Sequence, residues 1–157
     1  SGDIAPSIIF YLAKKYDYSL DEINALLQKK SGMLGLTGYS DLREIEAEAK
    51  NGNKACQLAL QMNTYRIKKY IGSYAAILNG LDAIVFTAGI GENSILMRQL
   101  VCEDLDFLGI ELDDKKNNVK PKGLRVINTE TSKVKILVIP TNEELEIAKQ
   151  SVKLFKN

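Results

Sequence analysis

Residues 81–97, LDAIVFTAGIGENSILM, constrain the fold of this chain more than any other segment. Residues 82–86 are rich in β-branched and aromatic side chains, which predicts a buried strand. Gly89 and Gly91 allow close backbone approach, and Asn93 or Ser94 can cap a helix that follows directly. Free amides and the positive end of a helix attract anions. The segment therefore predicts either a nucleotide site or an ordinary strand-to-helix turn, because it has neither the Rossmann nor the P-loop spacing.

Composition describes a globular protein and favours neither nucleic acid nor a membrane as partner. The 157 residues, 45% of them hydrophobic and 26% charged, suit one domain with a real core. The 21 basic and 20 acidic residues give a net charge of +1, and no basic stripe is present. The sequence has no signal peptide and no apolar run long enough to span a membrane. We therefore expect a cytoplasmic protein that acts on small molecules.

The absence of histidine limits the chemistry, because histidine is the commonest general base and the commonest metal ligand. Any reaction must use carboxylates, lysine, arginine or the backbone. Cys56 and Cys102 lie in helix-like segments without metal-ligand spacing. They predict buried, inert thiols in a reducing compartment.

The first half of the chain, residues 1–80, has the pattern of an α-rich segment. Ser19 and Glu22 have capping-box spacing, and Asp41 is placed to cap another helix. Helices are predicted over residues 5–16, 20–30, 41–50 and 54–78, with a packed loop over residues 31–40. The last of these helices has apolar residues on too many sides for one narrow face. We expect it to be largely buried.

The second half, residues 81–157, alternates strands and helices. Beyond the first strand, the pattern predicts a helix over 94–105, a polar turn region over 113–122, strands over 124–128 and 134–139, and a helix over 142–154. Residues 129–133 are short enough for a hairpin connection, and Pro121, Lys122 and Gly123 mark a reversal. This order implies a mostly parallel sheet with covering helices. Because two or three strands make a poor sheet, we expect the chain to be part of a larger domain.

Two strand-to-helix junctions are candidate sites, since ligands of open α/β sheets bind beyond the carboxyl ends of the strands. One follows Phe86 and the other follows Ile139. The second places Glu143 and Glu144 in a first helical turn, where carboxylates complement the helix dipole. Alternatively, one of them faces the cleft and holds Mg²⁺, usually through water, while phosphate oxygens supply other ligands.

Asp41 and Arg43 offer a similar choice. They are either a helix cap and a solvated surface charge, or part of a nucleoside site. In the second interpretation the carboxylate accepts hydrogen bonds from ribose hydroxyls, and the planar guanidinium stacks on a purine.

Several segments occur together in one order, and jointly they are far more specific than any one of them. They are SGDIAPSIIFYL, SGMLGLTG, SDLRE, VFTAGIGENS followed by LVCEDLDFLGIELD, and VINTETSKVKILVIPTNEELEIA. On these segments the whole chain, residues 1–157, resembles the C-terminal part of the acetate kinases, in the acetate and sugar kinase, heat-shock protein and actin superfamily. The resemblance implies an α/β fold, the C-terminal lobe of a duplicated ribonuclease-H-like (actin-like ATPase) fold that lacks its upstream strands.

The resemblance also implies the roles of particular residues. The nucleotide-binding residues it implies are Asp41, Leu42, Arg43, Gly89, Ile90, Gly91, Glu92 and Asn93. It assigns Glu143 to magnesium binding and leaves Glu144 as a structural or solvent-facing residue. The family's catalytic arginine, aspartate, histidine and asparagine lie upstream, so no catalytic residue is expected here.

The activity implied by the resemblance is reversible, Mg²⁺-dependent phosphoryl transfer from ATP to acetate, which gives ADP and acetyl phosphate. The chain is expected to be inactive without the missing N-terminal part. A homodimer formed largely through the C-terminal lobe is implied as well. Two alternatives stay open, namely a propionate or butyrate kinase of the same superfamily, and a non-catalytic nucleotide-binding or dimerisation module.

Overall fold

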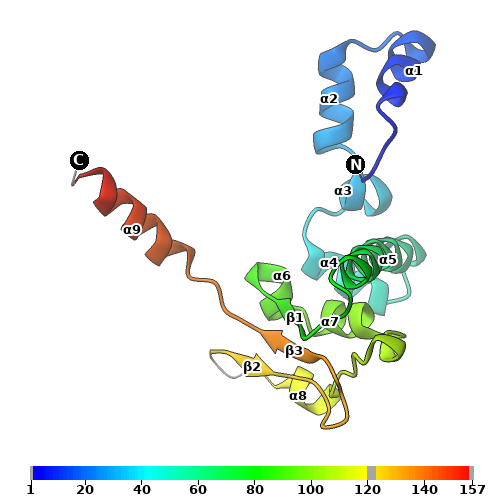
Figure 1. Cartoon of the computed structure of the whole chain (residues 1–157). Helices are drawn as coiled ribbons and strands as arrows, with labels where there is room; N and C mark the ends of the chain where they lie inside the picture. Colours follow the sequence, from blue (N-terminus) through cyan, green and yellow to red (C-terminus); the bar gives the residue numbers. More distant parts are fainter. Residues whose placement is uncertain (1, 120–122, 156–157) are drawn as a thin grey trace. The chain divides into compact units, whose positions relative to one another are not determined.

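The computed structural model describes residues 2–119 and 123–155 (Figure 1). The chain forms two compact units, Ser1–Asn63 and Thr64–Asn157, whose boundary lies inside one long helix, α5 (Lys54–Ile77). The first unit also contains α1 (Ser7–Tyr16), α2 (Leu20–Lys29), α3 (Gly32–Thr37) and α4 (Leu42–Lys50). The second contains β1 (Ala83–Phe86), α6 (Ala88–Asn93), α7 (Ile95–Cys102), the 3-10 turn η1 (Asp106–Leu108), α8 (Asp114–Asn118), β2 (Arg125–Val126), β3 (Lys135–Val138) and α9 (Glu143–Leu154).

The helices of the first unit begin where local capping signals place them. The capping box at the start of α2 is confirmed, because the Ser19 hydroxyl accepts from Glu22 N and the Glu22 carboxylate accepts from Ser19 N. Asp41 caps α4 by accepting from Arg43 N, as predicted. The unit buries a small apolar set that consists of Ile23, Ile45, Ala49, Cys56, Ala59 and Leu60.

The prediction of a loop over residues 31–40 is wrong, since this segment contains α3. Gly32 and Gly38 have φ of 65° and 80° and stand at the ends of the helix, where left-handed backbone favours glycine. Gly35 lies inside α3, and a Cβ there would be 2.8 Å from the carbonyl oxygen of Lys30, so this position requires glycine. The glycines therefore serve helix ends and a close approach. In the predicted turn region, residues 114–118 likewise form a helix, α8, capped by Asp113.

The expected burial of α5 is also wrong for the part of the chain that the structure describes. Many of its large side chains are exposed, among them Leu58, Met62, Tyr65, Tyr70, Tyr74 and Ile77. Its buried residues are small or central ones, such as Cys56, Ala59 and Ala75. The apolar pattern thus marks a helix with more apolar surface than its neighbours in this chain cover.

The sheet has the strand order β1-β3-β2. β1 pairs with β3 in parallel, with Phe86 opposite Val138, whereas β2 pairs with β3 antiparallel. The hairpin connection over residues 129–133 is therefore confirmed. The prediction of a mostly parallel sheet is wrong, because β2 is antiparallel to β3 and the sheet is a small mixed one. The reversal expected at Pro121 and Lys122 lies outside the described residues.

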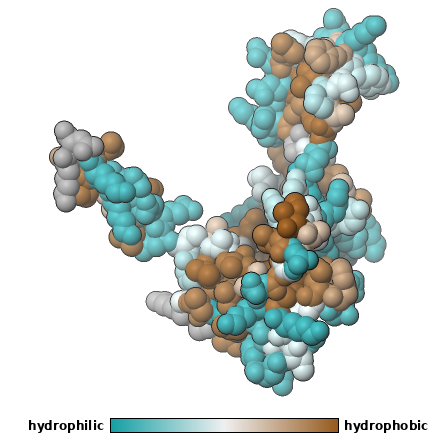
Figure 2. All heavy atoms as spheres, in the orientation of Figure 1, coloured by the Kyte–Doolittle hydropathy of each residue, from teal (hydrophilic) through white to brown (hydrophobic). Residues whose placement is uncertain are grey.

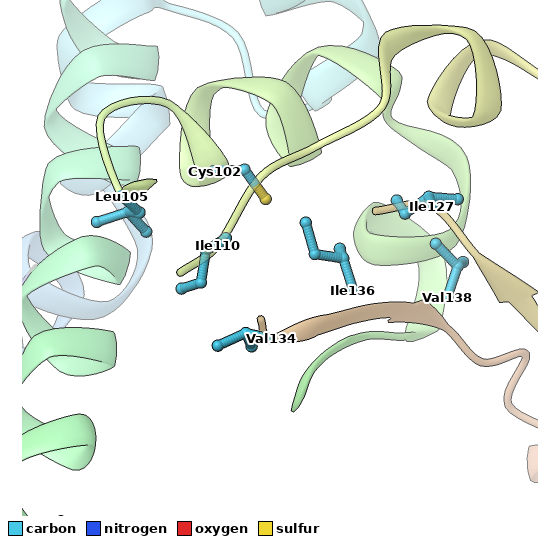
Figure 3. Close-up of a cluster of buried hydrophobic side chains, with 7 residues drawn as sticks. All are labelled: Cys102, Leu105, Ile110, Ile127, Val134, Ile136 and Val138. Atoms are coloured by element: carbon cyan, nitrogen blue, oxygen red, sulfur yellow. The ribbon is translucent and has the colours of Figure 1, made fainter. Parts of the chain in front are cut away.

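The core of the second unit lies against β3 (Figure 3). Its seven buried side chains are Cys102, Leu105, Ile110, Ile127, Val134, Ile136 and Val138. Alternate residues of β3 point to this core, and Ile136 and Val138 are 0% and 1% exposed. Burial of such a side chain stabilises the fold by about 1.5 to 3 kcal/mol, so this cluster fixes β3 firmly.

α9 differs from the other long helices of the second unit, because none of its residues is buried. Leu145, Ile147, Val152 and Leu154 are all exposed, and Figure 2 shows polar and apolar atoms side by side along this helix. Within the described ranges, no helix is both long and apolar enough to cross a membrane.

Candidate functional site

The glycine-rich segment forms a short helix, α6, directly after β1. Thr87 stands in extended conformation before it, and Ala88 has a left-handed φ of 57°, which costs an L-residue about 1 to 2 kcal/mol. Such strain is often found at functional turns. The two glycines differ in their surroundings. A Cβ on Gly91 would lie 3.0 to 3.3 Å from atoms of Phe86, whereas a Cβ on Gly89 would meet nothing within 4 Å.

The two strand-to-helix junctions lie side by side, because β1 and β3 are parallel neighbours. Ile139 N donates to Phe86 O over 2.9 Å, and the Thr87 hydroxyl donates to Ile139 O over 2.7 Å. Further along, Thr141 donates to Glu92 Oε1 twice, from its backbone N over 2.9 Å and from its hydroxyl over 3.1 Å. The glycine loop and the segment that leads to Glu143 therefore share one edge of the sheet.

A buried arginine lies behind α6. Arg98, on α7, is 1% exposed, and its guanidinium donates to Gly91 O, Glu92 O and two oxygens of Asn117 at 2.7 to 3.2 Å. The Asn117 side chain in turn donates to Ile95 O, and Arg125 donates to Glu92 O from the other side. Burial, and then repulsion from Arg125, lower the pKa of Arg98. Sequence reasoning missed this network, although a lone arginine among the apolar residues of 95–102 was a usable signal.

Glu143 and Glu144 occupy the first turn of α9, where Asn142 caps the helix by accepting from Leu145 N. Both carboxylates are exposed, and neither makes a hydrogen bond or ion pair with another described residue. Negative charge in a first turn complements the helix dipole in either case. The local geometry therefore leaves both side chains available to a ligand.

Asp41, Leu42 and Arg43 lie in the other compact unit, at the start of α4. The Arg43 side chain donates from Nε to both carboxylate oxygens of Asp41, at 3.0 and 3.1 Å. These hydrogen bonds, together with the one from Arg43 N, lower the pKa of Asp41 to about 2. The Arg43 side chain is 90% exposed, so one face of its guanidinium is open to a planar group.

Comparison with known proteins identifies the family. The model of the acetokinase family matches residues 1–149. The chain belongs to the acetokinase family. The acetate kinase of Flavobacterium johnsoniae is 64% identical over the whole chain, which covers 40% of that relative. The chain thus spans about 40% of the length of the curated relatives it matches.

Solved structures of acetokinases match the fold as well. The crystal structure of Porphyromonas gingivalis acetate kinase has a TM-score of 0.87 and 44% identity, and the match covers 99% of this chain and 39% of that one. The propionate kinase of Francisella tularensis has a TM-score of 0.86 and 40% identity over 94% of this chain and 38% of its own. The α/β fold class predicted from the sequence is confirmed by these matches.

The residues beyond the carboxyl ends of β1 and β3 fit the ligand requirements of a magnesium ion that is bound together with a nucleotide. Among the residues described, no group of three or more Cys, Asp or Glu side chains is placed to hold a metal. Mg²⁺ does not need such a group, since it keeps several waters and takes one or two carboxylates together with phosphate oxygens. A single exposed carboxylate at a strand end, such as that of Glu143, fits that pattern.

A cavity of about 520 Å³ lies on one side of β1, within the second unit. Its walls are apolar side chains of α5, β1 and α7, and Ile90 and Gly91 of α6 form part of its rim. Ligand pockets of this size combine apolar walls with a few converging polar groups. Thr87 supplies a hydroxyl here, but that hydroxyl is already bonded to Ile139 O. The cavity is therefore suited to apolar packing rather than to a polar ligand.

Proposed function

We propose that the complete protein containing this chain is an acetate kinase. It transfers a phosphoryl group reversibly from ATP to acetate, gives acetyl phosphate and ADP, and depends on Mg²⁺. The chain supplies the nucleotide side of the site, and the acyl side belongs to the part of the protein outside it. The identity of 64% to an acetate kinase over the full chain supports this assignment.

One observation carries the proposal, namely the position of α6 beside the β3–α9 junction at the carboxyl ends of parallel strands. Gly89, Ile90, Gly91, Glu92 and Asn93 form a backbone surface with open space at Gly89, which suits close approach by a nucleotide. Asp41, Leu42 and Arg43 are assigned to the nucleoside by family resemblance, and the exposed guanidinium of Arg43 suits stacking on a purine.

Glu143 is the residue that we assign to the metal. Magnesium, when bound, neutralises charge on the transferring phosphoryl group. The Glu143 carboxylate would hold the ion directly or through water, and Glu144 would remain a helix-dipole residue. The phosphoryl transfer itself uses no side chain of this chain as acid, base or nucleophile, so the chain by itself is expected to show no turnover.

The activity is tested on the complete protein with ATP, acetate and MgCl₂, by trapping acetyl phosphate as the hydroxamate. We expect product formation that stops when EDTA is added. No product from a folded, purified protein would refute the proposed reaction. Turnover by the isolated 157-residue chain would refute the proposal that the acyl side of the site lies outside this chain.

A matched pair of variants tests the nucleotide loop. Gly89→Val places its side chain in open space, so we expect near-normal stability and weak ATP binding. Gly91→Val forces a side chain against the Phe86 backbone, and overpacking of this kind costs about 1 to 3 kcal/mol or more. Calorimetric titration with ATP and thermal unfolding of both variants separate the two effects. Normal ATP affinity in folded Gly89→Val would place the nucleotide elsewhere.

The nucleoside assignment has its own test. Asp41→Ala and Arg43→Ala should raise the KM for ATP more than the KM for acetate in the complete protein. The reverse pattern would move these residues to the acyl side of the site.

The second candidate is a kinase that prefers propionate, and the similarity to the Francisella tularensis propionate kinase favours it specifically. Butyrate is a third acyl substrate for the same test. The ratio of kcat/KM for acetate, propionate and butyrate in the complete protein decides among them. A folded complete protein that binds ATP and phosphorylates none of the three acids would favour the non-catalytic module.

Two properties of the complete protein follow from the same proposal. We place it in the cytoplasm, where ATP is available and the free thiols Cys56 and Cys102 stay reduced. We also propose a homodimer, which the exposed apolar side chains of α5 support. Sedimentation of the complete protein tests the dimer.

A further inference from the structure

The segment between β3 and α9 is attached to the rest of the second unit by polar contacts. The described residues from Asn142 onward make hydrogen bonds only with one another, and α9 buries none of its side chains. Apolar packing in this chain therefore does not fix the direction of α9. The last hydrogen bonds that join the chain to the rest of the unit before Glu143 are those of Ile139 and Thr141.

Glu92 accepts both hydrogen bonds from Thr141, and both go to the same carboxylate oxygen, Oε1. They join residues that are 49 positions apart in the sequence, one on α6 and the other two residues before Glu143. The hydrogen bond from a backbone N–H to a charged carboxylate is among the stronger ones. The side chain of Glu92 is thus directed at the β3–α9 junction.

The backbone of Glu92 is itself held in place from behind. Its carbonyl oxygen accepts from Arg98 over 3.0 Å and from Arg125 over 3.0 Å. Arg98 is buried and also bonded to Asn117, so its position is fixed by the interior of the unit. The rigid interior, the nucleotide loop and the junction before α9 are therefore connected through this one residue.

We propose that Glu92 is a positioning residue, whose carboxylate holds Thr141 so that Glu143 is presented to the metal beside the nucleotide loop. The proposal rests on the proposed function, because it needs Glu143 to bind magnesium. The family resemblance assigns Glu92 to nucleotide binding, whereas this proposal gives its carboxylate a positioning role. Glu92 acts through Thr141 and need not touch the nucleotide with its side chain.

The test compares Glu92→Ala, Glu92→Gln and Thr141→Val in the complete protein. Glutamine keeps an oxygen at the position of Oε1 and so keeps both bonds to Thr141, but it loses the charge. Alanine loses both bonds, and valine at position 141 loses only the hydroxyl donor. ATP binding is measured by calorimetry in MgCl₂ and in EDTA, which gives the gain in affinity due to magnesium without any turnover.

We expect Glu92→Ala to reduce this magnesium-dependent gain about tenfold, the usual loss when the partner of a metal ligand is removed. The ratio of the affinity in MgCl₂ to the affinity in EDTA separates this effect from any change in nucleotide binding itself, and Glu92→Gln should restore most of the gain. The double variant of Glu92→Ala with Thr141→Val should be no worse than Glu92→Ala alone, because both changes break the same link.

Each of the following outcomes would overturn the proposal. A glutamine variant as defective as alanine would mean that the charge of Glu92 acts directly. Additive effects in the double variant would mean that Glu92 and Thr141 act separately. If Glu92→Ala does not fold, an unchanged magnesium gain in Thr141→Val together with a defective Glu92→Gln refutes the link.

Glu143→Ala, measured in parallel, separates this proposal from the proposed function. If Glu143→Ala loses the magnesium gain and Glu92→Ala does not, the positioning role alone is refuted. If Glu143→Ala keeps the gain in full, the metal assignment itself is wrong and the positioning role falls with it.

Discussion

Replacing Arg98 by methionine would test the polar network behind α6, the candidate nucleotide loop. Arg98 is 1% exposed and donates four hydrogen bonds, all of them to amide oxygens. Methionine has a similar length but donates nothing. Gly91 O and both oxygens of Asn117 would lose this donor, whereas Glu92 O would keep its bond from Arg125.

The expected size of the effect follows from these bonds. A buried acceptor that loses its donor costs about 1 to 3 kcal/mol, so the two buried oxygens of Asn117 cost roughly 2 to 6 kcal/mol and the partly buried Gly91 O adds a smaller cost. Removal of a buried cation returns several kcal/mol, because the guanidinium no longer has to be desolvated. We therefore expect a net loss of about 3 kcal/mol in local stability.

Native-state hydrogen exchange of the complete protein measures this loss at the amides of α6 and α7. Arg98→Lys should lie between the wild type and Arg98→Met, because an ammonium keeps the charge but cannot reach all four oxygens. Asn117→Leu is the matched partner, and its combination with Arg98→Met should cost less than the sum of the two. A loss below about 1 kcal/mol in Arg98→Met, or full additivity with Asn117→Leu, would refute the network.

Other predictions concern single side chains. Arg43 holds the pKa of Asp41 at about 2, below its usual 3.8, so the stabilisation is present above about pH 4 and is lost as the pH falls through about 2. Carbon-13 NMR should follow this titration, and an unchanged midpoint in Arg43→Ala would contradict the cause. Burial raises the pKa of Cys102 to about 12, so iodoacetamide at pH 8 should spare it in the folded protein, and rapid labelling found by peptide mass spectrometry would contradict its burial. Glu143→Ala should raise the Mg²⁺ concentration needed for half-maximal rate and Glu144→Ala should not, and interchanged effects would shift the metal assignment by one residue.

The features that the sequence predicted well are local ones. Ser19 and Glu22 are three residues apart, and Asp41 caps the residues that follow it, so each cap needs no information from elsewhere. The β1 strand and the helix capped by Ser94 were predicted for the same reason. Glycines misled the prediction at α3, because glycine marks helix ends as readily as loops.

The features that the sequence did not reveal depend on distant residues. Arg98 contacts Asn117 across 19 positions, and Glu92 contacts Thr141 across 49. Neither separation follows a helical or strand period, so no pattern predicts it. The candidate nucleotide residues were found through family resemblance, and the polar bonds that hold α6 in place required the structure.

The parallel pairing of β1 with β3 has a consequence for the order in which this protein folds during synthesis. β2 and β3 are close in sequence and can form their hairpin early, but β1 must wait for residues about 50 positions downstream, because Ala83 pairs with Lys135. Glu92 must wait for a similar length of chain, since its partner Thr141 is 49 positions downstream. A ribosome adds about 5 to 20 residues per second, so the glycine loop spends seconds without its partner. A released chain truncated before Thr141 is therefore expected to keep the β2–β3 hairpin and to lack the link between Glu92 and the β3–α9 junction.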